Sequence, residues 1–243
     1  MPGFPFPDRS LTATIIPKLM SSFLNASVGR KFLVSISGLF LIMFLAVHLT
    51  VNLFLIAGQE AYNLAAHFMA TNPAIKVMEP LLAAGFLLHI AYSAFITFTN
   101  QGTRPQKYAM VDQRETSSWP SRNMFVLGFL ILLFLVLHLS NFWYNMKFGE
   151  MTYIVYGGEE VQDAYSLVTG KFVIWWYALI YVAGAVFLGL HLVHGFASAF
   201  QTLGLSNHLW YRRLTVAGYI YAVIVAGGFA LIPLWFLVGN LAG

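Results

Sequence analysis

The chain has 243 residues, of which 59% are hydrophobic and only 9% are charged, and its formal net charge is +4. A soluble domain usually has about 25% charged residues, so this composition excludes an ordinary soluble protein and indicates a membrane protein. The absence of cysteine excludes disulfides, iron–sulfur ligation and zinc–thiolate sites within the chain. The basic residues lie in short segments between apolar runs, which points to membrane orientation rather than to nucleic-acid binding.

Five apolar runs are each long enough to cross a bilayer as a helix. They cover residues 32–56, 77–97, 124–144, 172–200 and 214–237. We therefore predict an all-α, multi-pass membrane protein, with one domain over 1–243 that begins with a cytoplasmic tail over 1–30. The segment "EAYNLAAHFMATNP" after the first run predicts a short surface helix, and residues 145–171 are expected to cover the outer face. We identify no internal sequence repeat.

Charge predicts the orientation of the five helices. Ten lysines and arginines lie in the tail and in the second and fourth connections, against three on the opposite side. An excess of basic residues marks the cytoplasmic side, so we expect the amino terminus inside and the carboxyl terminus outside. The ten are Arg9, Lys18, Arg30, Lys31, Arg104, Lys107, Arg114, Arg122, Arg212 and Arg213, and the three are Lys76, Lys147 and Lys171.

Histidines inside four of the helices form two groups by depth. At a rise of about 1.5 Å per residue, His48 and His138 lie about 20–25 Å from the cytoplasmic ends of their helices. His89 and His191 lie about 12–15 Å from that side on two helices that run inward. Ionisable residues at membrane depth are candidates for function. Four helices therefore offer one pair of imidazoles in the outer half of the membrane and one in the inner half.

Paired imidazoles across a helix bundle are suited to hold a six-coordinate haem iron, an arrangement used for electron transfer. Zinc would require three or four ligands at one point, and a proton relay would normally include buried carboxylates. For a single histidine, a polar contact between helices is an equally good interpretation, but two depth-matched pairs favour two haems. We expect a four-helix haem-binding core in which His48 and His138 bind the outer iron, and His89 and His191 the inner iron.

A second histidine, His194, lies close to His191 in the fourth run. The depth of His191 matches that of His89, and His194 lies nearer the cytoplasm, where we expect it beside a haem propionate. Gly85 and Gly184 share helix faces with His89 and His191. A missing side chain there would let a porphyrin approach the backbone, although ordinary close packing of helices explains such glycines equally well.

Four segments resemble the single-chain dihaem cytochrome b anchor of succinate:quinone oxidoreductases, the family of succinate dehydrogenases and fumarate reductases. The resemblance runs from about residue 28 to the end, and it is carried by the order and spacing of the segments. In that family a histidine followed four residues later by glycine, here His191 and Gly195, is the ligand position. The segments are "GRKFLVSISGLFLIMFLAVHLTVNLF", "FLLHIAYSAFITFTNQGTRPQKY", "FLVLHLSNFWY" and "HLVHGFASAFQTLG".

The resemblance implies a larger respiratory complex in a bacterial inner membrane. An iron–sulfur subunit would dock on the cytoplasmic face and carry a flavoprotein with covalent FAD, where succinate is oxidised. Electrons would pass through two haems b to a quinone, expected to be menaquinone. Arg30, Lys31, Arg104 and Arg122 would face the iron–sulfur subunit or the haem propionates, although the positive-inside rule alone also explains them.

Two positions bear on proton transfer. Glu79, at the outer start of the second run, is a candidate for proton exchange with quinone, and a favourable acid in a first helical turn is the alternative interpretation. Some family members carry a glutamate two residues before the ligand histidine of the fourth helix. Here Gly189 occupies that position, so a proton route of that kind is not expected.

Two other classes of protein stay open on the sequence. The first is a cytochrome b anchor of another membrane oxidoreductase, such as a hydrogenase or a formate dehydrogenase. The second is a haem-free transporter whose histidines bind substrate or protons, although transporters more often show repeats, broken helices and intramembrane carboxylates. Absorption bands of haem b would separate the cytochromes from the transporter.

Overall fold

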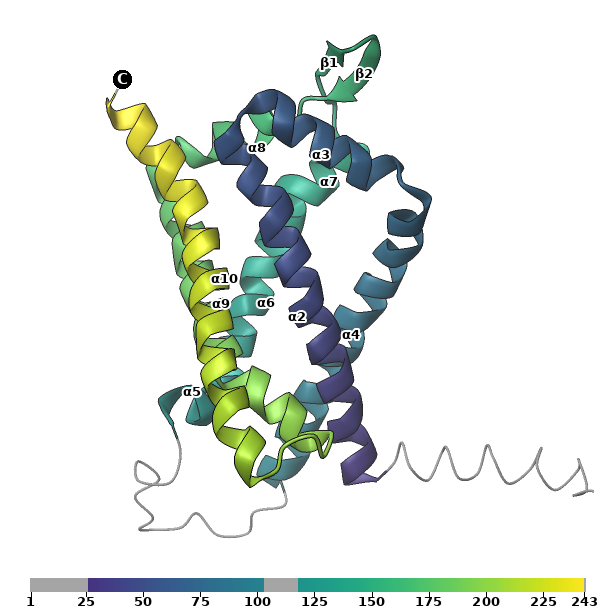
Figure 1. The fold of residues 1–243 in the computed structure, drawn as a ribbon, viewed down its shortest axis with the longest axis vertical. Helices are drawn as coiled ribbons and strands as arrows, with labels where there is room; N and C mark the ends of the chain where they lie inside the picture. Colours follow the sequence, from purple (N-terminus) through teal and green to yellow (C-terminus); the bar gives the residue numbers. More distant parts are fainter. Residues whose placement is uncertain (1–25, 103–117, 243) are drawn as a thin grey trace, which may run out of the picture.

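The computed structural model describes residues 26–102 and 118–242. Within these ranges, five long apolar helices match the predicted membrane-spanning runs, which confirms an all-α protein of the multi-pass membrane type. They stand side by side along the long axis of the molecule (Figure 1). In the numbering of Figure 1 they are α2 (Ser27–Ala57), α4 (Pro73–Gly102), α6 (Met124–His138), α9 (Trp175–Thr202) and α10 (His208–Ala242).

All five helices have bounds that differ from the predicted runs: α4 and α10 extend beyond theirs at both ends, and three other differences change the local structure. Helix α2 already begins at Ser27, so the last residues of the predicted tail are helical. The third apolar run is not one regular helix, because α6 continues into a π-helix, η1 (Leu139–Trp143), and then α7 (Tyr144–Phe148). The fourth run is interrupted after Phe172, where α8 (Ala164–Phe172) ends before α9 begins.

Side chains at the helix ends explain where several helices start. The amide oxygen of Asn72 accepts from the backbone N–H of Ala74, and Pro73, which has no N–H to satisfy, is the first residue of α4. Asn207 caps α10 in the same way by accepting from Leu209 and Trp210. Helix α2 stops at Gly58, whose φ of 120° is a backbone conformation that favours glycine.

Large apolar side chains cover the outside of the long helices. Met43 is 71% exposed, Leu87 69% and Val223 69%, which a soluble protein would bury. The buried core contains a limited set of Leu, Val, Ile and aromatic side chains together with alanines, while lipid would solvate the outer surface. The exposed apolar surface therefore indicates a lipid bilayer as the solvent of this fold.

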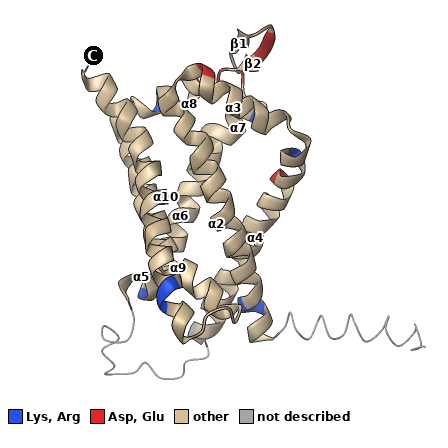
Figure 2. Ribbon diagram, viewed as in Figure 1, with Lys and Arg blue, Asp and Glu red and all other residues tan. Residues whose placement is uncertain are grey.

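The charged residues gather at the two ends of the bundle (Figure 2). Basic residues lie at the end that holds α5 (Trp119–Arg122) and the start of α10, and acidic residues lie towards the opposite end, together with some lysines. This separation agrees with the charge difference on which the predicted orientation rests. The assignment of the basic end to the cytoplasm stays a prediction.

At the other end, short elements form what we call the outer cap. It consists of α3 (Gln59–Thr71), the antiparallel hairpin of β1 (Tyr153–Tyr156) and β2 (Glu159–Gln162), and α8. Helix α3 is the surface helix predicted from "EAYNLAAHFMATNP", and the hairpin projects beyond the bundle (Figure 1). Residues 145–171 thus cover this end, as expected, in contact with α3, α9 and α10.

A buried carboxylate holds the outer cap together. Asp163 accepts hydrogen bonds from Asn63 Nδ2 at 3.0 Å and from Gln59 Nε2 at 3.1 Å, and its side chain caps α8 at Ser166 N. Asn63 is fully buried and also accepts from Tyr165 N at 2.8 Å. Burial raises the pKa of Asp163, but the hydrogen bonds from Ser166, Asn63 and Gln59 outweigh it and hold the pKa below the ordinary value.

Replacing Asp163 with alanine is expected to destabilise the protein by about 1–3 kcal/mol, because it leaves buried donors unpaired and removes a helix cap. The pKa of Asp163 is lower in the folded state than in the unfolded state. The ionised carboxylate therefore stabilises the fold fully above the ordinary pKa of an aspartate, and this stabilisation is lost as pH falls through the folded pKa. Thermal unfolding in detergent should therefore separate wild type from Asp163→Ala at neutral pH and bring them together in acid. Glu160→Ala on the exposed hairpin is the control, and equal losses in both variants would contradict the prediction.

Candidate functional site

The structure brings the four intramembrane histidines together in two pairs. His48 of α2 faces His138 of α6, with ring centroids 5.7 Å apart and ring planes at 89°. His89 of α4 faces His191 of α9, with centroids 6.3 Å apart and planes at 73°. These are the partners expected from depth alone, so four helices each supply one member of a pair. The role of the rings as iron ligands stays a prediction.

Two glycines locate the inner pair relative to the outer one. A Cβ on Gly38 of α2 would lie 3.3 Å from His89 Cε1, and one on Gly128 of α6 would lie 3.9 Å from His191 Cε1. Each glycine precedes the outer-pair histidine of its own helix by the same ten residues. At about 1.5 Å per residue, the two pairs are therefore separated by about 15 Å along the bundle.

Gly38 and Gly128 were not among the residues expected at the site, and each begins a short pattern that the two helices share. Residues 38–49, "GLFLIMFLAVHL", and 128–139, "GFLILLFLVLHL", both follow the pattern G-x5-F-L-x-x-H-L. The statement that the chain has no internal repeat is therefore wrong for these two short segments. Aligning the two helices on their histidines pairs Gly38 with Gly128 in the sequence, and the structure places both glycines beside the inner pair.

Aromatic rings surround the outer pair. Phe44 stacks on His48 at 5.2 Å and Phe134 stacks on His138 at 5.9 Å, and each precedes its histidine by one helical turn. Phe229 of α10 also contacts the His48 ring, at 5.6 Å. This largely apolar surrounding suits a flat hydrophobic group.

The π-helix directly after His138 changes which side chains face the core. One extra residue per turn places Asn141 and Phe142 in the interior, where Phe142 contacts the His138 ring at 5.5 Å. Asn141 Nδ2 donates to the hydroxyl of Tyr181 at 3.3 Å. Short π segments are frequent at functional sites, and this one completes the wall of the outer pair.

The structure assigns Gly85 and Gly184 to helix packing. A Cβ on Gly85 would lie 3.0 Å from the Phe40 ring, and one on Gly184 would lie 2.6 Å from the Phe134 ring. Both glycines therefore admit a phenylalanine from the neighbouring helix. Gly184 was expected to serve the inner pair through His191, but through Phe134 it supports the outer pair instead.

The inner pair has one hydrogen-bonded ring and one without a partner. His89 Nδ1 lies 3.2 Å from the backbone oxygen of Val34 and 3.3 Å from Ser37 Oγ. His191 Nδ1 is buried and has no hydrogen-bond partner among the described residues, and the same holds for His138 Nδ1 in the outer pair. Buried polar atoms in native proteins usually have a hydrogen-bond partner. Each histidine pair therefore contains one ring with a buried nitrogen that lacks such a partner among the described residues.

The two pairs fit the ligand set of a haem iron. A metal held between two imidazole nitrogens at about 2 Å from each would place the two ring centres about 6 Å apart. The ring-centroid distances of the two histidine pairs, 5.7 Å and 6.3 Å, are close to this value. Each pair offers two imidazoles, and no group of three or more metal-ligating side chains occurs within residues 26–102 and 118–242. The donor set therefore suits a group that brings its own equatorial ligands, as a porphyrin does.

His194 and Gly195 lie next to the inner histidine pair but are not part of it. The ring that meets His89 is that of His191, which agrees with the preference for His191 over His194. His194 is partly exposed, one turn towards the basic end of the bundle. Gly195 stands opposite Met124, whose Cε would be 3.5 Å from an added Cβ, an ordinary contact. The expected place of His194 beside a propionate stays a prediction.

The basic residues proposed for propionates or a partner subunit are only partly described. The guanidinium of Arg30 lies over the Phe95 ring of α4 at 4.6 Å, a cation–π contact. Lys31 and Arg122 have exposed side chains. Arg104 lies outside the described residues, as do Arg9, Lys18, Lys107 and Arg114. Their expected partners stay predictions.

Glu79 joins two helices at the outer end of the bundle. Its carboxylate accepts from Trp143 Nε1 of η1 and from Lys147 Nζ of α7, both at 2.8 Å. The pair with Lys147 is partly exposed, where such ion pairs contribute at most about 1 kcal/mol. Glu79 thus links α4 to η1 and α7 through two side-chain contacts, and its proton exchange with quinone stays a prediction.

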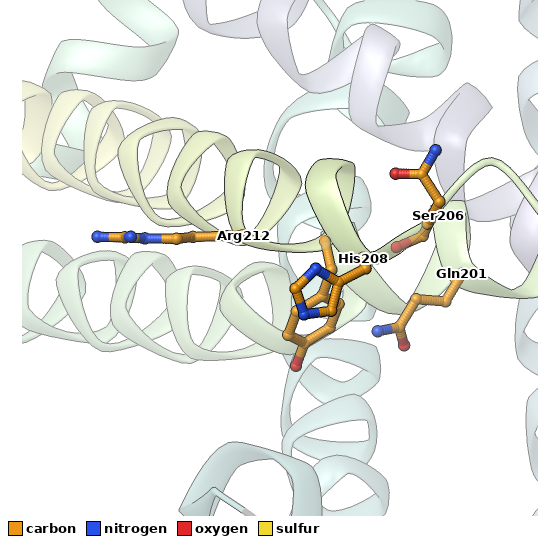
Figure 3. A pocket seen from close by; sticks show the side chains of 6 residues that line it. Gln201, Ser206, His208 and Arg212 are labelled. Atoms are coloured by element: carbon orange, nitrogen blue, oxygen red, sulfur yellow. The ribbon is translucent and has the colours of Figure 1, made fainter.

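An open pocket of about 460 Å³ lies at the turn between α9 and α10, away from the histidine pairs. Its lining includes Gln201, His208 and Arg212, and Figure 3 shows the Arg212 side chain extended away from the other two. The pocket holds none of the residues expected to bind haem. It belongs to the basic end of the molecule and not to the candidate site.

Comparison of the chain with protein-family models, with curated proteins and with solved structures finds no match. The functional assignment therefore depends on the residues and on their geometry.

Proposed function

We propose that this chain is the dihaem cytochrome b anchor of a succinate:quinone oxidoreductase, with the amino terminus in the cytoplasm of a bacterium. The observation that carries the proposal is the pairing of four histidines from four helices at two levels of the bundle. Haem b, when bound, supplies reversible one-electron chemistry at iron. Two such groups at two depths suit a subunit that moves electrons across the membrane.

The chain's own residues would orient and shield these groups. His48 and His138 would hold the outer haem, and His89 and His191 the inner one, as rigid ligands fixed on packed helices. Stacked Phe44 and Phe134 would keep water away from the outer ligands. Two imidazoles of the chain would hold each haem and leave no room at the iron for a substrate, which favours electron transfer over catalysis at the metal.

The ends of the bundle suggest how the subunit is used. The basic end would face the cytoplasm and meet an iron–sulfur subunit that carries a flavoprotein with covalent FAD. The outer cap would lie on the opposite side, near the outer haem and a membrane quinone, which we expect to be menaquinone. Succinate chemistry would take place in the flavoprotein, and this chain would pass the electrons.

Purification of the tagged chain from its native membranes tests the proposal. We expect two haems b per chain, sharp absorption bands after reduction, and co-purifying iron–sulfur and flavoprotein subunits, the latter with fluorescence of covalent flavin on a denaturing gel. A haem-containing complex with a hydrogenase or a formate dehydrogenase would show that the chain anchors a different oxidoreductase. A pure protein without haem would exclude a cytochrome and favour the transporter.

A further inference from the structure

The hydrogen bonds of His89 define the state of its ring. A backbone carbonyl can only accept, so the contact of Nδ1 with the Val34 oxygen at 3.2 Å requires a proton on Nδ1. The hydroxyl of Ser37 lies 2.8 Å from Leu33 O and 3.1 Å from Val34 O, so its own proton goes to a carbonyl. Its lone pair then accepts from the same Nδ1–H, which lies 3.3 Å away.

The position of this contact depends on two features of α2. A Cβ on Gly38 would lie 3.3 Å from His89 Cε1, closer than an ordinary contact, so the glycine leaves room for the His89 ring beside α2. Ser37 is itself buried, at 7% exposure, so water does not compete for the Nδ1–H. With Nδ1 protonated, Nε2 carries the free lone pair, which is the atom available to a metal.

The other three histidines lack an equivalent acceptor among the described residues. His138 Nδ1 and His191 Nδ1 have no partner. The ring nitrogens of His48 lie 3.5 Å from Asn52 Nδ2, an amide nitrogen that donates and cannot accept. His89 is therefore distinguished from the other proposed ligands by an acceptor for its N–H.

We propose that Ser37 is a positioning residue that, together with the Val34 carbonyl, fixes the tautomer of His89 and lowers the midpoint potential of the inner haem. The inference rests on the proposed function. A ligand imidazole that donates its remaining N–H is more basic and binds ferric iron more strongly. Reduction of that haem becomes less favourable, so the chain sets the inner potential separately from the outer one.

The test compares Ser37→Ala with Ser35→Ala, a change at another buried serine of the same helix. Both are made in the complete complex, and the two haem midpoint potentials are measured by redox titration of the absorption bands. We expect Ser37→Ala to raise one midpoint potential and leave the other unchanged, and Ser35→Ala to leave both unchanged. The haem whose midpoint potential shifts should be the haem that the His89→Ala variant lacks.

Three results would overturn the inference. They are unchanged potentials in Ser37→Ala, an equal shift of both haems, or an equal shift in Ser35→Ala. In each case two bound haems would leave the proposed function standing. A wild-type complex without haem would instead contradict the proposed function itself, and the two failures are therefore distinguishable.

Discussion

Replacing His191 with alanine is expected to remove one of the two haems b, whereas replacing His194 is expected to remove neither. A haem held by two histidines needs both of them, and among the described residues it is the ring of His191 that faces that of His89. The α-band absorbance of the reduced protein should fall by about half in His191→Ala. Haem content per chain, measured as the pyridine complex, checks the result.

The pairing makes this prediction more specific. His89→Ala should remove the same haem as His191→Ala, and His48→Ala the same haem as His138→Ala, as judged by the potential of the haem that is left. A His191→Gly variant to which free imidazole restores the lost band would show that the fold survives. Loss of a haem in His194→Ala but not in His191→Ala would reverse the ligand assignment, and normal haem content in all variants would exclude the haem site.

Replacing Gly184 with alanine is expected to weaken the outer haem site rather than the inner one. An added Cβ would lie 2.6 Å from Cδ2 and Cε2 of Phe134, too close for any real contact. Phe134 has little room to move, because it stacks on His138 and meets the edge of Tyr181 at 5.1 Å. The strain should destabilise the protein by about 1–3 kcal/mol and displace His138.

Thermal unfolding in detergent and haem content, measured together, check the effect of Gly184→Ala. Gly227→Ala on α10 is the matched control, because an added Cβ there meets nothing within 4 Å, and it should keep both haems and full stability. Combining Gly184→Ala with Phe134→Ala should recover part of the lost stability, since the contact that causes the strain is removed. Selective loss of the inner haem would mean that Gly184 acts through His191 after all.

The histidine pairs show how far a sequence can lead in a helical membrane protein. Along a helix, depth is proportional to residue number, so His48 and His138, or His89 and His191, can be matched before any contact is known. Hydropathy identifies the five spans for a similar reason, because the bilayer fixes the length of a crossing helix. Both predictions depend on distance along one axis, which the chain encodes directly.

What the sequence could not provide is the rotation of each helix and the identity of its neighbours. Gly184 shares a helix face with His191, yet its space is filled by Phe134 from α6, and its effect falls on the outer pair. The cap around Asp163 joins residues more than a hundred positions apart, such as Gln59. One of the two acceptors of the His89 N–H is the backbone oxygen of Val34 on α2, an atom that every residue carries and no residue type reveals.

The sequence by itself thus determined the membrane class, the five helices and the two depths at which four histidines lie, because these follow from composition and from linear position. The tertiary structure decided which rings meet, that Gly38 and Gly128 lie beside the inner pair, and that a π-helix follows His138. These features depend on contacts with side chains of neighbouring helices. Packing between helices selects one rotation among several that hydropathy allows, since lipid solvates every apolar face almost equally well.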